Sequence, residues 1–558
     1  MSILTISDTI GDIKRFRTIT ALVWEEGFAF VLEKARLRWG VPIECRIRCF
    51  LKMCAGMWKP QPGNDYPVRL RVLLTKLGPS FVKLGQVLSL RPDLLPQELT
   101  TELSKLTNQV PSFPYSQVEQ IIEKDLGKPI EKIFKHFDDK PLAAASLAQV
   151  HKAVLFDGTK VAVKVQRPGI RSVIEKDIHI MALFARQLSE RVPEWRIFRP
   201  ILLVKEFAET IGRELDFTIE AIHGKRFEAM FEDDGTIKVA HVFKEYSSKN
   251  VLTMDLIEGV RLDNEKSLKN AKIDKKILAQ NGVNALLRQV FVEGFFHADP
   301  HPGNYFALPG NVFAFIDYGM VGRLMQKDRL ELASFFISFL NEDSESAIKH
   351  LLHIVDTTQD SNIPSFEHDV DDILHEWYGA KLKDVSLAQA FFRIMESGRK
   401  NGIYFPSSFA YLGKSLLTTE AMGFSLDPEF DIADQMRPYI KKIIKEELNP
   451  IKAKTKILDQ SLDYINYAQT FPEATMRLID KLSSGEIGVK INLEELESFE
   501  KKLSSAGYKR LITTIIIMII IAVGISYLVQ YSLLNLHLSV GTFSIILLII
   551  FLIWILRR

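Results

Sequence analysis

Cysteine is scarce in this chain of 558 residues, which contains only three. Cys45, Cys49 and Cys54 lie together in one basic, apolar, helix-like stretch. A structural zinc site needs a fourth ligand, and the first histidine of the chain is His136, far downstream. We therefore expect buried, reduced thiols, which fit a reducing cytoplasm.

An excess of charge is also missing, since 71 Lys and Arg residues stand against 69 Asp and Glu residues. The resulting net charge of +2 gives no reason to expect a nucleic-acid partner. No signal peptide opens the sequence, because charged residues such as Asp8 and Lys14 interrupt Met1–Thr20. Internal repeats and long low-complexity linkers are absent as well, and Pro60–Pro67 is the best linker candidate.

The strongest chemical signal is the segment Phe296–Asn304, followed by the triplet Asp317-Tyr318-Gly319. An aspartate, an asparagine shortly after it and a second aspartate after a strand form the metal and phosphoryl end of kinase-like nucleotide sites. The apolar run Val312–Ile316 predicts a buried strand that delivers Asp317 to a pocket. This arrangement indicates a site for ATP.

The polar residues of this segment match the tasks of such a site. Polyphosphate needs hard cations, and Mg²⁺ requires one or two protein oxygens, which Asn304 and Asp317 can supply. Asp299 can then orient or deprotonate an attacking hydroxyl or water, and we assign it as a catalytic residue. The alternative is a polar loop in which His297 and His301 cap strands and the aspartates make turns.

A candidate phosphate-binding lysine lies upstream, at the end of Val161-Ala162-Val163-Lys164. This run has the form of the kinase strand whose lysine reaches the α- and β-phosphates, and Asp157-Gly158 before it predicts a hairpin turn. Surface lysines end many strands, so the run alone is a weak signal. The order of Lys164, Asp299 and the metal ligands along the chain makes it a strong one.

Alanines replace the glycine-rich loop of a kinase within Pro141–His151. Glycine lets backbone amides approach phosphates, whereas alanine adds a Cβ and biases the loop towards helical geometry. We expect Ala143, Ala144, Ala145 and Ser146 to contact the nucleotide with altered phosphate positioning. A packed loop without a ligand is the alternative.

A second strand signal precedes the expected C-terminal lobe. Met254 and Asp255 end an apolar run, and the segment continues to Gly259. This segment looks like the link between kinase lobes that borders adenine. We therefore place Met254 and Asp255 at the nucleotide.

Several motifs together resemble those of the UbiB family, atypical kinase-like proteins that support ubiquinone biosynthesis. They are Phe81–Gln86, Ser89–Pro96, the alanine loop, Glu214–Phe217 and His297–Asn304, within a similarity that runs from about Pro67 to about Pro428. The resemblance implies a kinase-like fold with ATPase activity and a Lys-x-Gly-Gln extension packed over the site. It also implies work on isoprenoid quinone precursors at a membrane.

The extension can be interpreted physically as a helix over Phe81–Leu88. Lys83 and Gln86 then share one face and point into the site, while apolar residues dock on the body. The carboxylates available to Lys83 and Lys164 are Glu214, Asp216 and Glu220. The pattern leaves open which carboxylate meets which lysine, and a solvated amphipathic helix is the alternative. Such an extension fills the groove of a protein substrate, which argues against protein phosphorylation.

Tyr318 departs from the family pattern, in which phenylalanine is usual. The tyrosine keeps the ring and adds a hydroxyl that needs a partner when it is buried. This change affects the packing of the turn and leaves the metal ligand Asp317 in place.

Two charge-free runs close the sequence, Leu511–Val529 and Leu538–Leu556. Each is about 28 Å long as a helix at roughly 1.5 Å per residue, enough to span a bilayer. Basic pairs at Lys509-Arg510 and Arg557-Arg558 predict a transmembrane hairpin with both ends in the cytoplasm, at the inner membrane of a bacterium. The basic, aromatic N-terminal stretch either lies on an anionic leaflet or packs as ordinary helices.

The expected architecture is α+β: a protein-kinase-like two-lobe fold with an N-terminal helical extension and a C-terminal transmembrane hairpin. The predicted segments are a basic helical region (1–60), the Lys-x-Gly-Gln extension (61–115), the N-lobe (116–258), the C-lobe with helices beyond it (259–505) and the hairpin (508–558). The expected function is a magnesium-dependent ATPase acting on membrane-embedded quinone precursors. A lipid or small-molecule kinase and a nucleotide-binding scaffold for biosynthetic enzymes remain alternatives.

Overall fold

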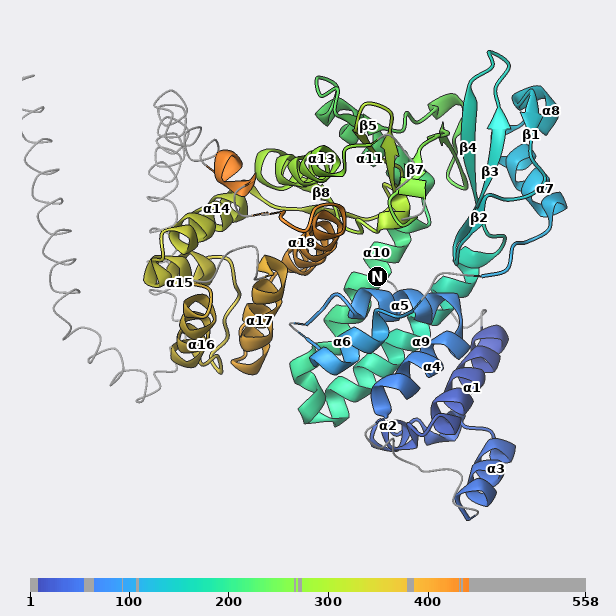
Figure 1. Ribbon diagram of the computed structural model, residues 1–558. Coiled ribbons are helices and arrows are strands. Elements are labelled where there is room, and N and C mark those ends of the chain that lie inside the picture. Colours follow the sequence, from blue (N-terminus) through green and yellow to red (C-terminus); the bar gives the residue numbers. More distant parts are fainter. Residues whose placement is uncertain are drawn as a thin grey trace, which may run out of the picture. The chain divides into compact units, whose positions relative to one another are not determined.

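A computed structural model describes residues 9–440 of the chain (Figure 1). The first part of this range is helical. Short gaps in this description fall at 55–64, 93, 107–109, 265–266, 269–272, 379–385, 431 and 433–434. The described residues belong to one compact unit, Met1–Ala453. The extension helices are α1 (Thr9–Glu25), α2 (Ala29–Lys34), α3 (Ile43–Cys54), α4 (Tyr66–Leu77), α5 (Pro79–Leu88) and α6 (Gln97–Leu103).

The N-terminal helix α1 docks on the body of the protein. Arg15 forms an ion pair of 2.7 Å with the fully buried Asp177 and donates a hydrogen bond to the carbonyl of Leu77. Phe16 and Ile19 are buried in a core shared with α4, α5 and the long helices α9 (Ile170–Arg191) and α10 (Pro200–Glu214). Part of the N-terminal region therefore packs as ordinary helices, while Trp39, Ile43 and Ile47 stay exposed, and contact with an anionic leaflet remains the alternative for these side chains.

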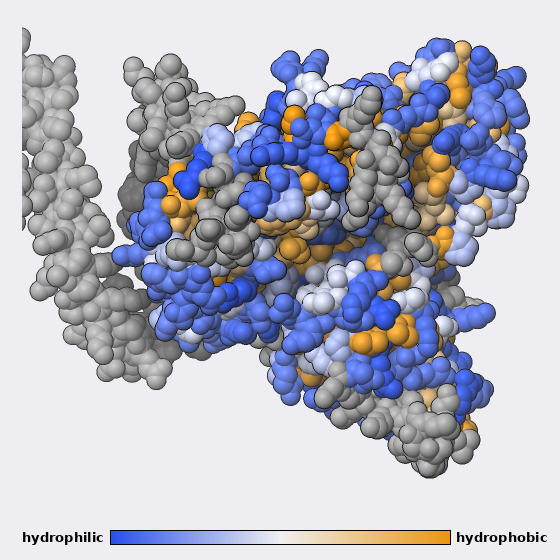
Figure 2. Space-filling view, in the orientation of Figure 1, coloured by the Kyte–Doolittle hydropathy of each residue, from blue (hydrophilic) through white to orange (hydrophobic). Residues whose placement is uncertain are grey.

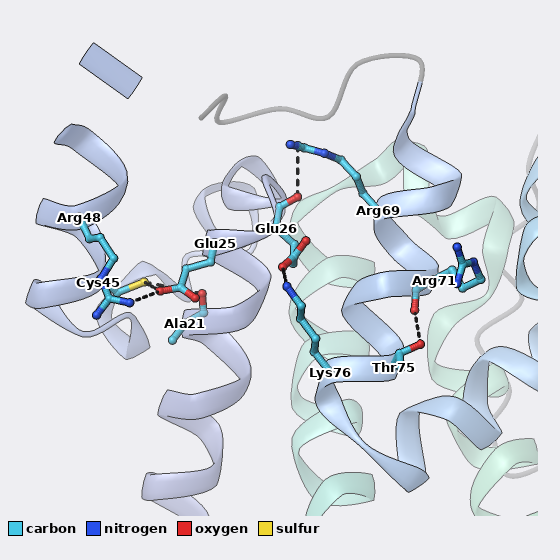
Figure 3. Close-up of polar contacts among 9 residues, drawn as sticks. All are labelled: Ala21, Glu25, Glu26, Cys45, Arg48, Arg69, Arg71, Thr75 and Lys76. Atoms are coloured by element: carbon cyan, nitrogen blue, oxygen red, sulfur yellow. Dashed lines mark hydrogen bonds and ion pairs between the residues drawn. The ribbon is translucent and has the colours of Figure 1, made fainter. Parts of the chain in front are cut away.

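The cysteine-containing helix α3 is fastened to α1 by Glu25 (Figure 3). This carboxylate accepts from Arg48 at 3.2 Å and lies 3.4 Å from the sulfur of Cys45. Glu26 next to it binds Lys76 of α4. Burial, with Glu25 nearby, raises the pKa of Cys45 to about 12, and Cys49 is also buried and, like Cys45, is not part of a disulfide. The prediction of buried reduced thiols is confirmed for these two residues.

An antiparallel sheet in the order β1-β3-β4-β6 forms the core of the N-lobe, with β2 paired to β3. The elements here are α7 (Tyr115–Leu126), α8 (Ile130–Ile133), β1 (His136–Phe137), β2 (Ala143–Ala144), β3 (Ala148–Val154), β4 (Lys160–Gln166), α11 (Phe217–Met230) and β6 (Val251–Asp255). Asp157-Gly158 forms the predicted hairpin turn between β3 and β4, with glycine at φ 91°. Successive strand residues point to opposite faces, so Val161, Val163 and Val165 enter the core under α7 and α8 while Lys164 faces the other way.

The C-lobe is mainly helical and contains two small sheets. Its elements are β7 (Val260–Arg261), α13 (Lys275–Leu287), η5 (Arg288–Glu293), β8 (Phe295–His297), η6 (Pro302–Asn304), β9 (Tyr305–Leu308), β10 (Val312–Phe315), β11 (Val321–Arg323), α14 (Gln326–Leu340), α15 (Ser344–Leu352), α16 (Ile363–His375), α17 (Leu387–Lys400) and α18 (Ser407–Leu426). Strand β10 confirms the predicted buried strand before Asp317 and lies between β9 and β5 (Ile237–Val239). The pairing of β10 with β5 is parallel, although β5 lies between α11 and β6 in the sequence. A large aromatic core with buried Phe227, Phe295 and Phe315 supports these strands.

The membrane location expected from the sequence is contradicted. In the described parts of residues 9–440, no helix is both long enough and apolar enough to cross a bilayer; the longest, α9, is interrupted by charged residues such as Lys176 and Arg186. The two predicted spans, Leu511–Val529 and Leu538–Leu556, lie outside the described residues. Figure 2 shows a face that is mostly hydrophilic, with hydrophobic residues gathered in separate patches.

Candidate functional site

Lys164 lies on the inner face of the N-lobe sheet, opposite Val150 of β3 and Leu252 of β6. Its ammonium group binds both carboxylate oxygens of Glu220, which projects from α11, at 2.8 and 2.9 Å. The ring of Phe217 lies 5.2 Å away and adds a cation–π contact. Burial alone would lower the pKa of Lys164, but Glu220 and Asp317 raise it, so the lysine is held as a cation.

Lys83 of α5 forms the second buried ion pair of the site, with Glu214 at the end of α10 and a distance of 2.7 Å. Both side chains are largely buried, at 15% and 9% exposure. Burial disfavours the charge on Lys83, but Glu214, Asp299 and Asp317 outweigh it and raise the pKa of the amine. The extension thus delivers a cation to the carboxylates of the C-lobe.

The remaining motif residues have local roles. Asp216 is the N-cap of α11 and accepts from the backbone and hydroxyl of Thr218, with Lys249 3.8 Å away. Gln86 donates to the carbonyl of Leu106 at 3.0 Å. This amide therefore anchors α5 to the segment after α6, and the role of Gln86 at the site stays a prediction.

The glycine of the Lys-x-Gly-Gln motif, Gly85, lies where α5 packs closely against neighbouring side chains. A Cβ at this position would lie 2.3 Å from Leu106 and 2.8 Å from Leu74, too close for either contact. Only glycine therefore fits at this position of α5 without displacing Leu106 and Leu74.

We expect Gly85→Ala to lower the free energy of unfolding by about 1 to 3 kcal/mol, as overpacking does in other cores. Gly212→Ala is the matched control, since Gly212 is also helical but an added Cβ would meet no atom within 4 Å. Alanine there should stabilise α10 by about 0.5 to 1 kcal/mol. Thermal and urea unfolding of both variants measure the difference, and equal stability of Gly85→Ala and the parent would contradict the packing argument.

Asp299 follows β8 and is fixed at both its backbone and its side chain. Its backbone N–H donates to Nδ1 of His297 at 3.1 Å, and its carboxylate forms an ion pair of 2.6 Å with Lys414 of α18. Burial lowers the pKa of His297, which suits a neutral ring whose Nδ1 accepts a hydrogen bond. The carbonyl of His297 accepts from Ser415 at 2.7 Å.

Asn304 and Asp317 are joined by the short segment η6 and strand β10. The backbone N–H of Ile316 donates to the carbonyl of Asn304 at 3.2 Å, which places Asn304 next to the turn that carries Asp317. One oxygen of Asp317 accepts from the N–H of Gly319 at 3.0 Å. His301 accepts from the N–H of Gly303 and so caps the helical turn η6, whereas the alternative interpretation had it cap a strand. Asp317 interacts electrostatically with Lys83 and Lys164. A carboxylate and a nearby amide oxygen are ligands of the kind that Mg²⁺ takes, so Asp317 and Asn304 fit this ion.

Tyr318 is fully buried, and its hydroxyl has the partners that the sequence demands. The hydroxyl accepts from the N–H of Ala240 at 2.7 Å and lies 3.0 Å from the carbonyl of Phe315 and 3.2 Å from that of Ala240. The ring of His223 meets the carbonyl of Tyr318 at 3.0 Å. The added hydroxyl therefore ties the turn of Asp317 to the strand region after β5.

The alanine loop is extended, which corrects the expected helical bias. Ala143 and Ala144 form β2 and pair with Val150 and Gln149, and the N–H of Ala145 donates to the carbonyl of Ala148. Pairing with β3 outweighs the helix propensity of alanine. Ser146, in the turn, is buried.

Met254 and Asp255 end β6, beside β4, with Val161 opposite Asp255. The carboxylate of Asp255 binds Lys238 at 3.2 Å and accepts from the N–H of His241. Met254 is buried, and the place of Met254 and Asp255 beside adenine stays a prediction.

Lys83, Lys164, Glu214, Glu220, Asp299 and Asp317 are thus brought into one network of ion pairs and charge interactions. Sequence reasoning missed Lys414 and Ser415. Both residues lie on α18, and no local pattern in its sequence links a lysine on that helix to Asp299. Only the tertiary fold reveals the contact.

The domain comparisons agree with this architecture. Residues 105–351 match the ABC1 atypical kinase-like domain, and residues 370–431 match the UbiB helical domain. The fold and the site therefore define an atypical kinase-like protein with mixed helices and strands.

Relatives identify the family. "Probable protein kinase UbiB" of Marinobacter nauticus is 35% identical over 397 residues, which cover 70% of this chain and 72% of the relative. The protein of the same name from Histophilus somni is 30% identical over 557 residues, or 98% of each chain. This chain belongs to the UbiB family. Among solved structures, the complex of Rv3197 with erythromycin from Mycobacterium tuberculosis matches 62% of this chain and 91% of that chain, with 23% identity and a TM-score of 0.43.

Proposed function

We propose that this protein is a magnesium-dependent ATPase that supports ubiquinone biosynthesis by acting on isoprenoid quinone precursors or making them accessible. The observation that carries the proposal is that Lys164 of the N-lobe interacts electrostatically with Asp317 of the C-lobe, while Lys83 of the extension interacts with both Asp317 and Asp299. Family membership is consistent with the quinone pathway. The curated relatives are named as probable protein kinases, but the placement of Lys83 beside the same carboxylates favours a smaller acceptor than a protein.

Each residue has a proposed role at the nucleotide. Lys164 would bind the phosphates while it remains close to Glu220. Asn304 and Asp317 would hold Mg²⁺, and the ion would neutralise the charge of the polyphosphate. Asp299 accepts the proton of the attacking water or hydroxyl. The β2–β3 turn with Ala145 and Ser146 borders the phosphates, and the end of β6 borders adenine.

ATP labelled at the γ-phosphate tests this proposal directly. Purified protein is incubated with Mg²⁺ and vesicles that contain a polyprenyl phenol, and free phosphate and extracted lipid are counted separately. Label in free phosphate, increased by the phenol, supports the ATPase. Label in the lipid would instead establish a lipid kinase, and no transfer to either acceptor, with nucleotide bound, would favour a scaffold.

Lys83 is expected to restrain the productive geometry of the phosphates, because it competes for Asp299 and Asp317 from the extension. Lys83→Ala should therefore raise the rate of phosphate release several-fold. Lys76→Ala is the control, since Lys76 is an exposed lysine on the same extension that binds Glu26. A rate and a nucleotide affinity that both equal the parent values would remove this role.

A further inference from the structure

Two consecutive residues of helix α18 contact the segment His297–Asp299, which carries the proposed catalytic carboxylate. Lys414 reaches Asp299 at 2.6 Å, and Ser415 donates to the carbonyl of His297 at 2.7 Å. One contact fixes the proposed catalytic carboxylate, and the other fixes the backbone two residues before it. The segment is therefore held from one side by a single helix turn.

This helix is itself rigidly placed in the C-lobe. Leu412, Gly413 and Leu416 are buried, and a Cβ on Gly413 would lie only 3.0 Å from the ring of Phe391 on α17. Lys414 projects from this packed turn and keeps 26% of its side chain exposed, next to a carboxylate that is 36% exposed. Both side chains of the pair are therefore partly accessible to solvent. Residues 370–431, which include α18, match the UbiB helical domain.

The charges around Asp299 agree with a fixed carboxylate. Burial alone would raise the pKa of Asp299, but Lys414 lowers it, with smaller contributions from His297 and Lys83. Lys414 is the one of these three that forms an ion pair with Asp299 among the described residues.

We propose that Lys414 is a positioning residue for Asp299, so that the UbiB helical domain completes the phosphoryl-transfer site. This inference rests on the proposed ATPase function. As the oxygen of water forms its bond to the γ-phosphorus, its proton passes to the Asp299 carboxylate. The bond between that phosphorus and the bridging oxygen breaks, and ADP leaves with the electron pair. Lys414 forms no covalent bond and keeps the accepting oxygen aimed at the water.

Three variants test the role of Lys414. Lys414→Met removes the charge at similar size, Lys414→Arg keeps it, and Lys400→Met makes the same change at an exposed ion pair of α17. We expect Lys414→Met to lower kcat for phosphate release on the order of 10- to 100-fold while the Kd of ATP stays close to the parent value. Lys414→Arg should recover most of the rate, and Lys400→Met should match the parent. A parental kcat in Lys414→Met, or an equal loss of kcat and ATP affinity in both Lys414 variants, would overturn the proposal.

A second measurement does not depend on turnover. The unfolding midpoints of Lys414→Met, Asp299→Asn and the double variant form a cycle that isolates the interaction between the two side chains. A coupled pair predicts that Lys414→Met lowers the midpoint less in the Asp299→Asn background than in the parent. Strictly additive shifts would show that the pair does not form and would overturn the inference. If the parent protein released no phosphate, the proposed function would fail, while this cycle would still decide on the pair.

Discussion

Asp317→Asn should lower the rate of ATP hydrolysis by roughly 10²- to 10³-fold, in the range seen when an enzyme loses one charge-stabilising group of its transition state. Asp317 is the proposed carboxylate ligand of Mg²⁺ and also raises the pKa of both Lys83 and Lys164. Asparagine keeps an oxygen that can accept from Gly319 but removes the negative charge. The loss should therefore be chemical, with the fold intact.

Two binding measurements separate this effect from a general loss of nucleotide. The affinity for ATP is measured with Mg²⁺ and with a chelator, and only the parent should bind more tightly with the metal. Asp274→Asn is the control, because Asp274 caps α13 and asparagine caps helices equally well. If Asp317→Asn kept both its turnover and the metal dependence of its affinity, Asp317 would not be a metal ligand.

Glu220→Gln should lower the free energy of unfolding by about 2 to 3 kcal/mol, since it leaves a largely buried ammonium without its bidentate partner. Glu220 is 4% exposed and Lys164 is 23% exposed. Asp317 and Glu214 remain nearby and offset part of the loss, which keeps the estimate below that for a fully isolated charge. The midpoint of thermal unfolding, followed by circular dichroism, reports this change.

Strand β4, which carries Lys164, also provides a matched control for Glu220→Gln. Lys160 of β4 forms an ion pair of 2.9 Å with Glu258, but both side chains are exposed, at 57% and 61%. Glu258→Gln should leave the midpoint almost unchanged, because exposed ion pairs contribute little. Equal shifts in the two variants would mean that burial does not decide the strength of the Lys164 pair.

Local patterns in the sequence predicted several elements at the right place. The hairpin turn at Asp157-Gly158, the helix over Phe81–Leu88 and the strand before Asp317 depend on short-range chemistry, and all three are present. The positions of Lys164 and Asp317 follow from them, since each residue lies at a defined point of its strand.

The partners of these residues could not be predicted in the same way. Glu214, Asp216 and Glu220 are close in sequence, but they end α10, cap α11 and lie one turn into α11, respectively. The break between the two helices sends Glu214 to Lys83 and Glu220 to Lys164, and leaves Asp216 to the cap. Lys414 was missed because its partner Asp299 is distant in the chain and nothing in the sequence of α18 marks the contact.

The parallel pairing of β5 with β10 limits how the two lobes can move. The chain leaves the N-lobe after α11, enters the C-lobe sheet as β5, returns as β6 and crosses again to β7. If the lobes moved about the connection from β6 to β7 alone, β5 would have to separate from β10, or the bridge between Val242 and Met254 would have to break. A hinge motion that separates the two lobes is therefore disfavoured. Exchange of ADP for ATP is expected to need only the rearrangement of side chains at the entrance to the site.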